Sequence, residues 1–400
     1  MKRKIWSKRI ISAVTAALMI FAIGCSNKTI DTSDYPVPVA EGNEEVQNQT
    51  NEETEEKHAG YLSDVSDEDV IKPEKNSLKE DGKYTYNPAI IPKWIVEKYK
   101  DNPKIIRVSK EILIAINNCD TEYVLDENLK MTDEEINLVS NIVYVSNPIA
   151  SIVYWEPTET KNVYKLLYFP YYGISEAEAE NGTAEPVSVD MDEVKNTVDD
   201  FKNYVSDTIN NNITADMNEK EMAAAIYRHI IKDYEFAPKD TDDYLSLNFD
   251  TISEGEMVNG AIENKYTSGI ELERIFSFFM CQLQIEMQDI TGGGGYFDKK
   301  IQETLGDKRP LGYGWLWQIV YLDGEPYHAD IILEKLIYDE KNQDNEDAEP
   351  ELLFFGMSDE TRMETYKFSS TNTVIIDLLT GEDIGDIPKC TSDYSATKGY

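Results

Sequence analysis

One stretch, residues 315–330, decides the fold: Trp315-Leu316-Trp317-Gln318-Ile319-Val320-Tyr321-Leu322-Asp323-Gly324-Glu325-Pro326-Tyr327-His328-Ala329-Asp330. Apolar and aromatic side chains dominate its first half. The dipeptide Asp323-Gly324 suits both central positions of a type I′ turn. The chain then returns from Glu325 to Leu333. This pattern predicts a long antiparallel hairpin with a two-residue loop.

Helices are expected on the N-terminal side of this hairpin. The segment from Ser268 to about Gln284 is apolar nearly all round a helix, which predicts a buried central helix, and residues 285–290 can form a strand. Two earlier amphipathic helices are expected, one built on Val194, Val198, Phe201, Val205 and Ile209, the other starting at the cap Asn218 with Glu221 three residues on. Helices packed on an antiparallel sheet are typical of an α+β fold.

A smaller α+β unit is expected ahead of these elements, over residues 84–185. Residues 105–116 and 133–142 have helical spacing, and residues 152–155 and 163–169 read as the two strands of a hairpin. The acidic, apolar-poor stretch 176–185 predicts a boundary. The larger domain would then occupy residues 186–396.

Several motifs, in order, resemble those of the transglutaminase-like family, whose fold belongs with the papain-like cysteine enzymes. Thr267-Ser268-Gly269-Ile270 lies where the family has Cys-Ser-Gly-Tyr at the start of its central helix. Gly314-Trp315-Leu316-Trp317-Gln318 is similar to Gly-His-Ala-Trp-Asn, and Pro326-Tyr327-His328-Ala329-Asp330 to Trp-Tyr-His-Val-Asp. Ile387-Pro388-Lys389-Cys390 resembles a closing segment. The resemblance implies a transglutaminase-like domain and covers roughly residues 105–395.

The catalytic groups of that family are not carried over with the fold. The family uses a Cys nucleophile, a His that takes the thiol proton and an Asp that orients the His. By resemblance those positions are Thr267, Trp315 and Asp330 here. A Thr hydroxyl is a weak nucleophile without an adjacent base, and an indole N–H can only donate. We therefore expect no catalytic residue at this degenerate triad.

A rebuilt site would need other groups, and Cys281 with His328 is the fallback pair. His328 lies two residues before Asp330, on the same face of a regular strand. Cys281 lies 14 residues beyond Thr267, about 21 Å along a helix at 1.5 Å per residue, and such a Cys is usually inert core. The alternative to a non-catalytic domain is thus a transglutaminase or cysteine peptidase with rearranged catalytic groups.

An aromatic cluster offers a further candidate site. Tyr313, Trp315 and Tyr327 could line a ligand-binding surface, or Trp315 could simply fill the position of the lost His. Cys119, Cys281 and Cys390 have neither paired nor zinc-ligand spacing, so we expect no metal and no cofactor.

The first 24 residues have the features of an export signal. Five basic residues precede an apolar run from Ile10 to Gly24, which is short for a membrane span. Ala22-Ile23-Gly24-Cys25 resembles a bacterial lipobox, which implies lipidation at Cys25 and an anchor on the outer face of the cytoplasmic membrane. Residues 25–83 are acidic and aperiodic, and we expect a disordered tether.

The net charge narrows the choice of partners. The 400 residues hold 76 acidic and 38 basic side chains, a net charge of −38, and removal of the signal makes it −43. Nucleic acid binding needs a basic surface and is excluded. We expect a surface-anchored lipoprotein that binds or scaffolds peptide, protein or glycan at the cell envelope.

Overall fold

The predicted hairpin is the centre of the larger sheet. Strand β8 (Trp315–Leu322) pairs antiparallel with β9 (Glu325–Ala329). The loop residues Asp323 and Gly324 have φ angles of 53° and 83°. Two consecutive positive φ values define a type I′ turn, whose twist matches that of the strands. The prediction made from the Asp-Gly dipeptide is confirmed.

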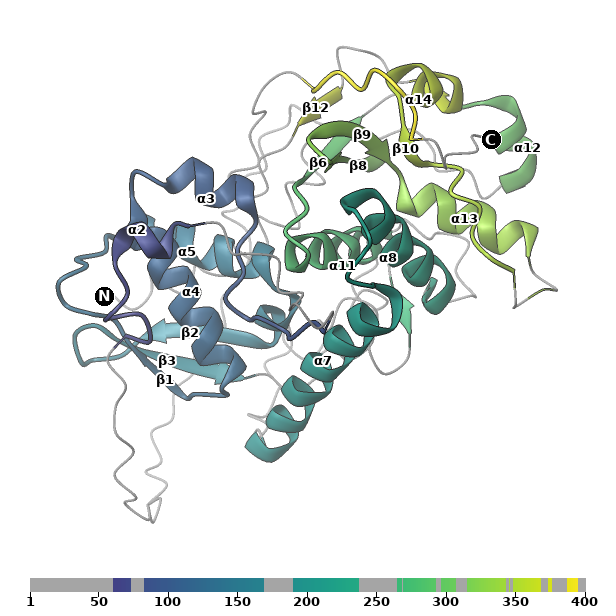
Figure 1. Ribbon diagram of the computed structural model, residues 1–400. Coiled ribbons are helices and arrows are strands. Elements are labelled where there is room, and N and C mark those ends of the chain that lie inside the picture. Colours follow the sequence, from purple (N-terminus) through teal and green to yellow (C-terminus); the bar gives the residue numbers. More distant parts are fainter. Residues whose placement is uncertain are drawn as a thin grey trace, which may run out of the picture.

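The structure is a computed structural model that describes residues 60–72, 83–168, 190–236, 265–267, 269–292, 296–306, 315–342, 345, 348–367, 373–375 and 387–394. These residues form an α+β protein, as expected (Figure 1). The signal segment, Cys25, Tyr313 and the acidic stretch 176–185 lie outside the described residues.

Five strands make the larger sheet, in the order β10-β9-β8-β6-β12, and every neighbouring pair is antiparallel. The other three strands are β6 (Met287–Gly292), β10 (Phe355–Met357) and β12 (Thr373–Ile375). The expected buried helix is α11 (Gly269–Gln282), and it contacts β6, β8, α8 and α13 (Figure 1). Its Leu272, Phe276 and Phe279 are at most 1% exposed.

Five further helices and two short strand pairs complete the described part of this half. The helices around the sheet are α7 (Met191–Asn212), α8 (Glu219–Asp233), α12 (Lys299–Leu305), α13 (Ile331–Lys341) and α14 (Asp359–Thr365). Strand β4 (Glu235–Phe236) pairs parallel with β5 (Tyr266–Thr267), and β7 (Tyr296–Phe297) pairs antiparallel with β11 (Tyr366–Lys367). The capping box predicted at Asn218 and Glu221 is present.

The N-terminal unit is built on a three-stranded antiparallel sheet of order β1-β3-β2. Its strands are β1 (Glu122–Val124), β2 (Val153–Pro157) and β3 (Val163–Tyr168). Its helices are α2 (Asp67–Val70), α3 (Lys93–Tyr99), α4 (Pro103–Asn117), α5 (Asp133–Ser146) and the 3-10 helix η2 (Pro148–Ile152).

Residues 60–72 fall within the predicted tether, yet the structure folds them onto α4. Arg107 of α4 donates to the carbonyl oxygens of Leu62 and Val65, and Lys110 donates to that of Val70 at 2.9 Å. Glu111 accepts from the backbone N–H of Leu62 at 3.0 Å. The prediction of disorder is wrong here, because side chains on α4 satisfy the segment's backbone groups and Val70 is buried.

Polar and aromatic contacts join the two units. The hydroxyl of Tyr84 donates to Gln282 at the end of α11, and Asn210 of α7 bonds both backbone groups of Tyr84. The guanidinium of Arg274, on α11, lies 4.4 Å from the ring centre of Tyr144 on α5. Helix α11 is therefore shared by the sheet, the surrounding helices and the N-terminal unit.

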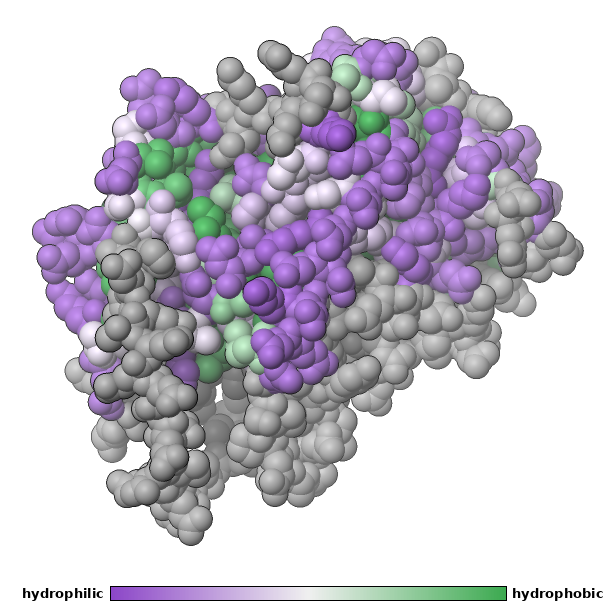
Figure 2. Space-filling model, turned by 60° about the horizontal axis from the view of Figure 1, so that its bottom comes forward, coloured by the Kyte–Doolittle hydropathy of each residue, from purple (hydrophilic) through white to green (hydrophobic). Residues whose placement is uncertain are grey.

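The outer surface is largely hydrophilic on the face drawn in Figure 2, where green side chains gather in small areas only. This agrees with the high content of charged residues. Within the described residues, no helix combines the length and apolar character needed to cross a bilayer.

The contacts of Arg107 predict how the docked segment is held. Arg107→Met should release the carbonyl oxygens of Leu62 and Val65 and destabilise the fold by about 2 kcal/mol, because hydrogen bonds to charged groups are worth more than neutral ones. Hydrogen exchange should accelerate over residues 60–72. Lys165→Met, an exposed change on β3, is the matched control. Unchanged exchange in the Arg107 variant would mean that the segment is held by its apolar side chains instead.

Candidate functional site

Two of the three positions that resemble a triad, Trp315 and Asp330, are in direct contact. Trp315 and Trp317 are two residues apart on β8, so they share a face. Ile319 pairs directly with His328 across the hairpin, which places His328 on that face too. Asp330 follows β9 directly as the N-cap of α13. The register ends at Ala329 and Asp330 lies beyond the strand, so the expectation that it shares a face with His328 stays a prediction.

Trp315 is hydrogen-bonded to Asp330. The indole Nε1 donates to Oδ2 of Asp330 at 2.6 Å, and Oδ1 accepts from the backbone N–H of Leu333 at 2.8 Å. Asp330 is completely buried. Burial raises its pKa to about 7, and the bonds from Leu333 and Trp315 act in the opposite direction. The Asp therefore keeps a partner, but that partner cannot accept a proton.

The Trp315 ring is closely packed inside the protein. It is 5% exposed, and the ring of Phe297 stands perpendicular to it with centroids 5.0 Å apart. Tyr327 is 4% exposed. Both rings are therefore almost covered by protein, and the ligand-binding role expected of Tyr313, Trp315 and Tyr327 stays a prediction.

Thr267 lies at the start of the central helix, as the resemblance implies. It is fully buried on β5, opposite Phe236 of β4. Two residues on, a Cβ added to Gly269 would meet Cδ1 of Ile332 at 3.4 Å. The start of α11 thus packs against the start of α13, where Asp330 is the cap. The segments that carry the three positions named by the resemblance therefore converge, and those positions hold a hydroxyl, an indole and a carboxyl.

The fallback pair of Cys281 and His328 is wrong. Cys281 is buried on α11, next to Gln282, which bonds Tyr84 in the N-terminal unit. Burial raises the pKa of its thiol, which keeps it protonated. Among the described residues, the thiol that lies near His328 is that of Cys390.

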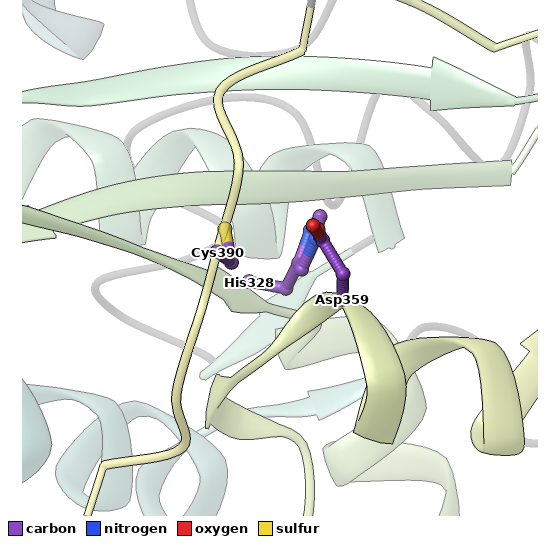
Figure 3. Close-up of side chains that lie close together, drawn as sticks. All are labelled: His328, Asp359 and Cys390. Atoms are coloured by element: carbon purple, nitrogen blue, oxygen red, sulfur yellow. The ribbon is translucent and has the colours of Figure 1, made fainter.

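His328, Asp359 and Cys390 form a compact cluster from three separate segments, whose possible ligand atoms lie within 4.8 Å of one another (Figure 3). His328 comes from β9, Asp359 opens α14 and Cys390 lies on the extended segment 387–394. Nε2 of His328 is 2.9 Å from Oδ1 of Asp359. Sequence reasoning missed this cluster, since its only signal was that Cys390 fell in a motif resembling a closing segment.

The tautomer of His328 decides what this cluster can do. Nε1 of Trp317 donates to Nδ1 of His328 at 3.0 Å, so Nδ1 carries a lone pair and the proton sits on Nε2, where it is donated to Asp359. Both ring nitrogens are then occupied. The imidazole has no free lone pair with which to accept a proton from Cys390.

The same tautomer of His328 disfavours the binding of a metal ion by this cluster. Cys, His and Asp suit Zn²⁺, but ligation through Nε2 would put a proton on Nδ1, facing the N–H of Trp317. Burial lowers the pKa of His328 to about 4 and raises that of Cys390 to about 12, so both groups stay neutral. The bond between His328 and Asp359 joins β9 to α14, and the backbone N–H of Asp359 donates to the carbonyl oxygen of Cys390 in the segment 387–394.

The comparisons with known proteins add little to this geometry. No family model and no curated protein matches the chain. A solved structure described as a TGase overlaps at a TM-score of 0.27 with 7% identity, covering 52% of this chain and 50% of that one. A candidate protease from Parabacteroides distasonis overlaps at 0.21 with 13% identity, covering 44% and 35%. The chain thus spans half or less of these structures, and similarities this weak carry no argument.

Removal of the Trp315 donor should be costly. Trp315→Phe keeps an aromatic ring beside Phe297 but leaves Oδ2 of Asp330 buried without its donor, which should cost about 1–3 kcal/mol of unfolding free energy in denaturant titrations. In an Asp330→Asn background the same change should cost less, since the charge-assisted bond is already gone. Equal costs in the two backgrounds would show that only packing is lost.

The tautomer of His328 can be read directly. ¹⁵N-edited NMR of the folded protein at pH 7 should show a neutral ring protonated at Nε2, with Nδ1 as acceptor. Trp317→Phe should free Nδ1 and leave the ring as a mixture of tautomers, while the partly buried Trp155→Phe in the other sheet should change nothing at His328. A proton found on Nδ1 of the unaltered protein would contradict the assignment and reopen the metal interpretation.

Proposed function

We propose that this chain is a surface-anchored bacterial lipoprotein whose residues 186–396 form a transglutaminase-like domain without catalysis. Its role would be binding or scaffolding at the cell envelope. The observation that carries the proposal is the bond from Nε1 of Trp315 to Oδ2 of Asp330. It occupies the carboxylate that would orient a catalytic His, and its donor cannot act as a base.

Three further features support the absence of catalysis. Thr267 is completely buried and carries no thiol. Both ring nitrogens of His328 are engaged, so it cannot serve as the base of a rearranged enzyme. Burial keeps the thiols of Cys281 and Cys390 protonated. An active transglutaminase or cysteine peptidase would need one accessible thiol paired with one free imidazole.

The envelope location is argued from the N-terminal segment. The basic and apolar pattern of residues 1–24, followed by Cys25, supports export and lipid attachment. A tether would then run from residue 26 to about residue 59, because residues 60–72 are docked on α4. Peptide or glycan is the ligand class we favour, since the resembled family acts on peptide carbonyls and an acidic chain is unsuited to nucleic acid.

Chemical labelling tests the non-catalytic proposal. The full-length protein in detergent, treated with a thiol-directed electrophile at pH 7.5, should be modified at Cys281 and Cys390 only after denaturation, as read by mass spectrometry of peptides. Hydroxyl-directed electrophiles should leave Thr267 unmodified, and amidase and transamidase assays should give no turnover. Stoichiometric, time-dependent modification that abolishes such a turnover would refute the proposal and support the enzyme alternative.

Lipid attachment has its own test. Metabolic labelling with an alkyne fatty acid in a bacterial host should label the unaltered chain and place it in the membrane fraction. Cys25→Ser should abolish both results, and Cys119→Ser should abolish neither. A labelled and membrane-bound Cys25→Ser chain would contradict the anchor.

Ligand binding separates a binding domain from an inert scaffold. Peptide and glycan arrays probed with the tagged chain should give a saturable hit that survives Thr267→Ala, because the proposal places no function on that side chain. Loss of the hit in Thr267→Ala, with the fold intact, would return the ligand site to the triad position.

A further inference from the structure

A second group of polar side chains is buried between α11 and the larger sheet. Glu273 of α11 is 4% exposed and Gln318 of β8 is completely buried. Asp289 of β6 pairs directly with Gln318 across the sheet, so the two side chains share a face. Ser277, one turn beyond Glu273 on α11, lies 3.5 Å from Oδ1 of Asp289. None of these residues belongs to the triad positions or to the His328 cluster.

Some polar atoms of this group have no hydrogen-bond partner if the carboxyls of Glu273 and Asp289 are both ionised. Oε1 of Glu273 and both amide atoms of Gln318 are buried and lack an aligned hydrogen-bond partner among the described residues. The amide is nevertheless near enough to both carboxyls to influence their titration. Buried polar atoms without partners are expensive, so something must complete the network.

We propose that the Glu273 carboxyl is protonated at neutral pH and donates a hydrogen bond to the carbonyl oxygen of Gln318. The amide N–H₂ of Gln318 in turn donates a hydrogen bond to an ionised Asp289. A carbonyl oxygen can bond a carboxyl only if that carboxyl carries a proton. One proton therefore supplies the donor that Oε1 of Gln318 lacks. The pairing of Gln318 with Asp289 across the sheet places the amide beside the carboxyl that its N–H₂ would bond.

The charged groups nearby place the proton on Glu273 rather than on Asp289. Burial raises the pKa of Asp289 to about 6, but Ser277 and Arg274 act in the opposite direction, so this carboxyl is ionised above pH 7. Asp289 is also partly exposed, whereas Glu273 is buried. Glu273 faces two further carboxyls, Asp289 and Asp330, and both disfavour its charge.

The other elements packed on α11 do not compensate Glu273. Glu271 on α11 itself is paired with Arg274 at 3.0 Å. Helix α8 contributes Tyr227, α5 contributes Tyr144 beneath Arg274, and η2 contributes no titratable side chain. Helix α13 contributes Glu334, which accepts from the backbone of Leu353 and Phe354, and Lys335, which is paired with Asp339 at 2.5 Å. The described surroundings of Glu273 thus offer an amide and two acids, and the pKa of Glu273 is accordingly raised well above its usual range, mainly by burial.

The device that follows is pH-sensitive. Raising the pH toward the folded-state pKa of Glu273 would place two adjacent charges under α11, the helix that also contacts the N-terminal unit through Arg274 and Gln282. A carboxyl whose pKa is raised in the folded state stabilises the fold less as the pH rises above its unfolded value. The protein should therefore be more stable in mild acid than in mild alkali. The inference is independent of the proposed function.

The test compares the pH dependence of unfolding for the full-length protein and two variants. Between pH 7 and 8 the slope of stability against pH reports the protons that the folded state holds in excess. Glu273→Gln, which keeps the shape and supplies a permanent donor, should remove about one proton from that slope. Asp289→Asn should leave the slope unchanged in this range, because Asp289, with a pKa of about 6, is already ionised there.

Infrared spectroscopy gives a readout that does not depend on the variants' stability. A protonated-carboxyl C=O band should be present in the unaltered protein at pH 7.5, and one band should vanish in Glu273→Gln. An unchanged unfolding slope together with an unchanged band would overturn the proposal. So would stabilisation by millimolar Ca²⁺ or Na⁺ at pH 8 in the unaltered protein but not in Glu273→Gln, since a cation would then occupy the site instead of a proton.

Discussion

The larger domain depends on one buried carboxylate, that of Asp330. The two carboxylate oxygens accept hydrogen bonds from the Trp315 indole and the Leu333 backbone N–H. The backbone N–H of Asp330 donates to the carbonyl of Phe354, and the backbone carbonyl of Asp330 accepts from the Tyr227 hydroxyl. These bonds connect β8, α8, α13 and the chain entering β10. The indole of Trp315 holds this junction together by donating to the carboxylate, and an indole N–H has no lone pair with which to accept a proton.

A second indole donor lies two residues along β8. Trp317 donates to His328 and thereby holds the imidazole as a donor to Asp359. The two indoles lie on one face and reach across the hairpin in parallel. Each indole N–H satisfies a buried acceptor, so the two bonds stabilise the packing on this side of the sheet. A Cys–His–Asp cluster can therefore lie in the protein without being either a catalytic triad or a metal centre.

The spacing of apolar and turn-forming residues predicted the hairpin turn, the central helix and the buried face of α7, because each of these depends on a few residues that are neighbours in the sequence. It also indicated that Thr267 and Trp315 could not support the family's chemistry, which is a matter of residue type. It failed for Cys390 and for residues 60–72, whose partners lie far away in the chain. Neither the apposition of Gln318 and Asp289 nor the burial of Glu273 could be predicted without the register of β6 on β8. Hydrophobic periodicity reports which side of an element is buried, but not what it meets there.

Hydrogen exchange at the indole N–H of Trp315 tests the central claim most directly. If that N–H is bonded to Asp330 in a filled, closed position, it should exchange only as fast as the core amides of α11, which open with global unfolding. Partly buried Trp94 provides the internal comparison. Exchange of the Trp315 indole as fast as that of Trp94 would contradict the account, because it would mean that the position is open to water and could still admit a substrate.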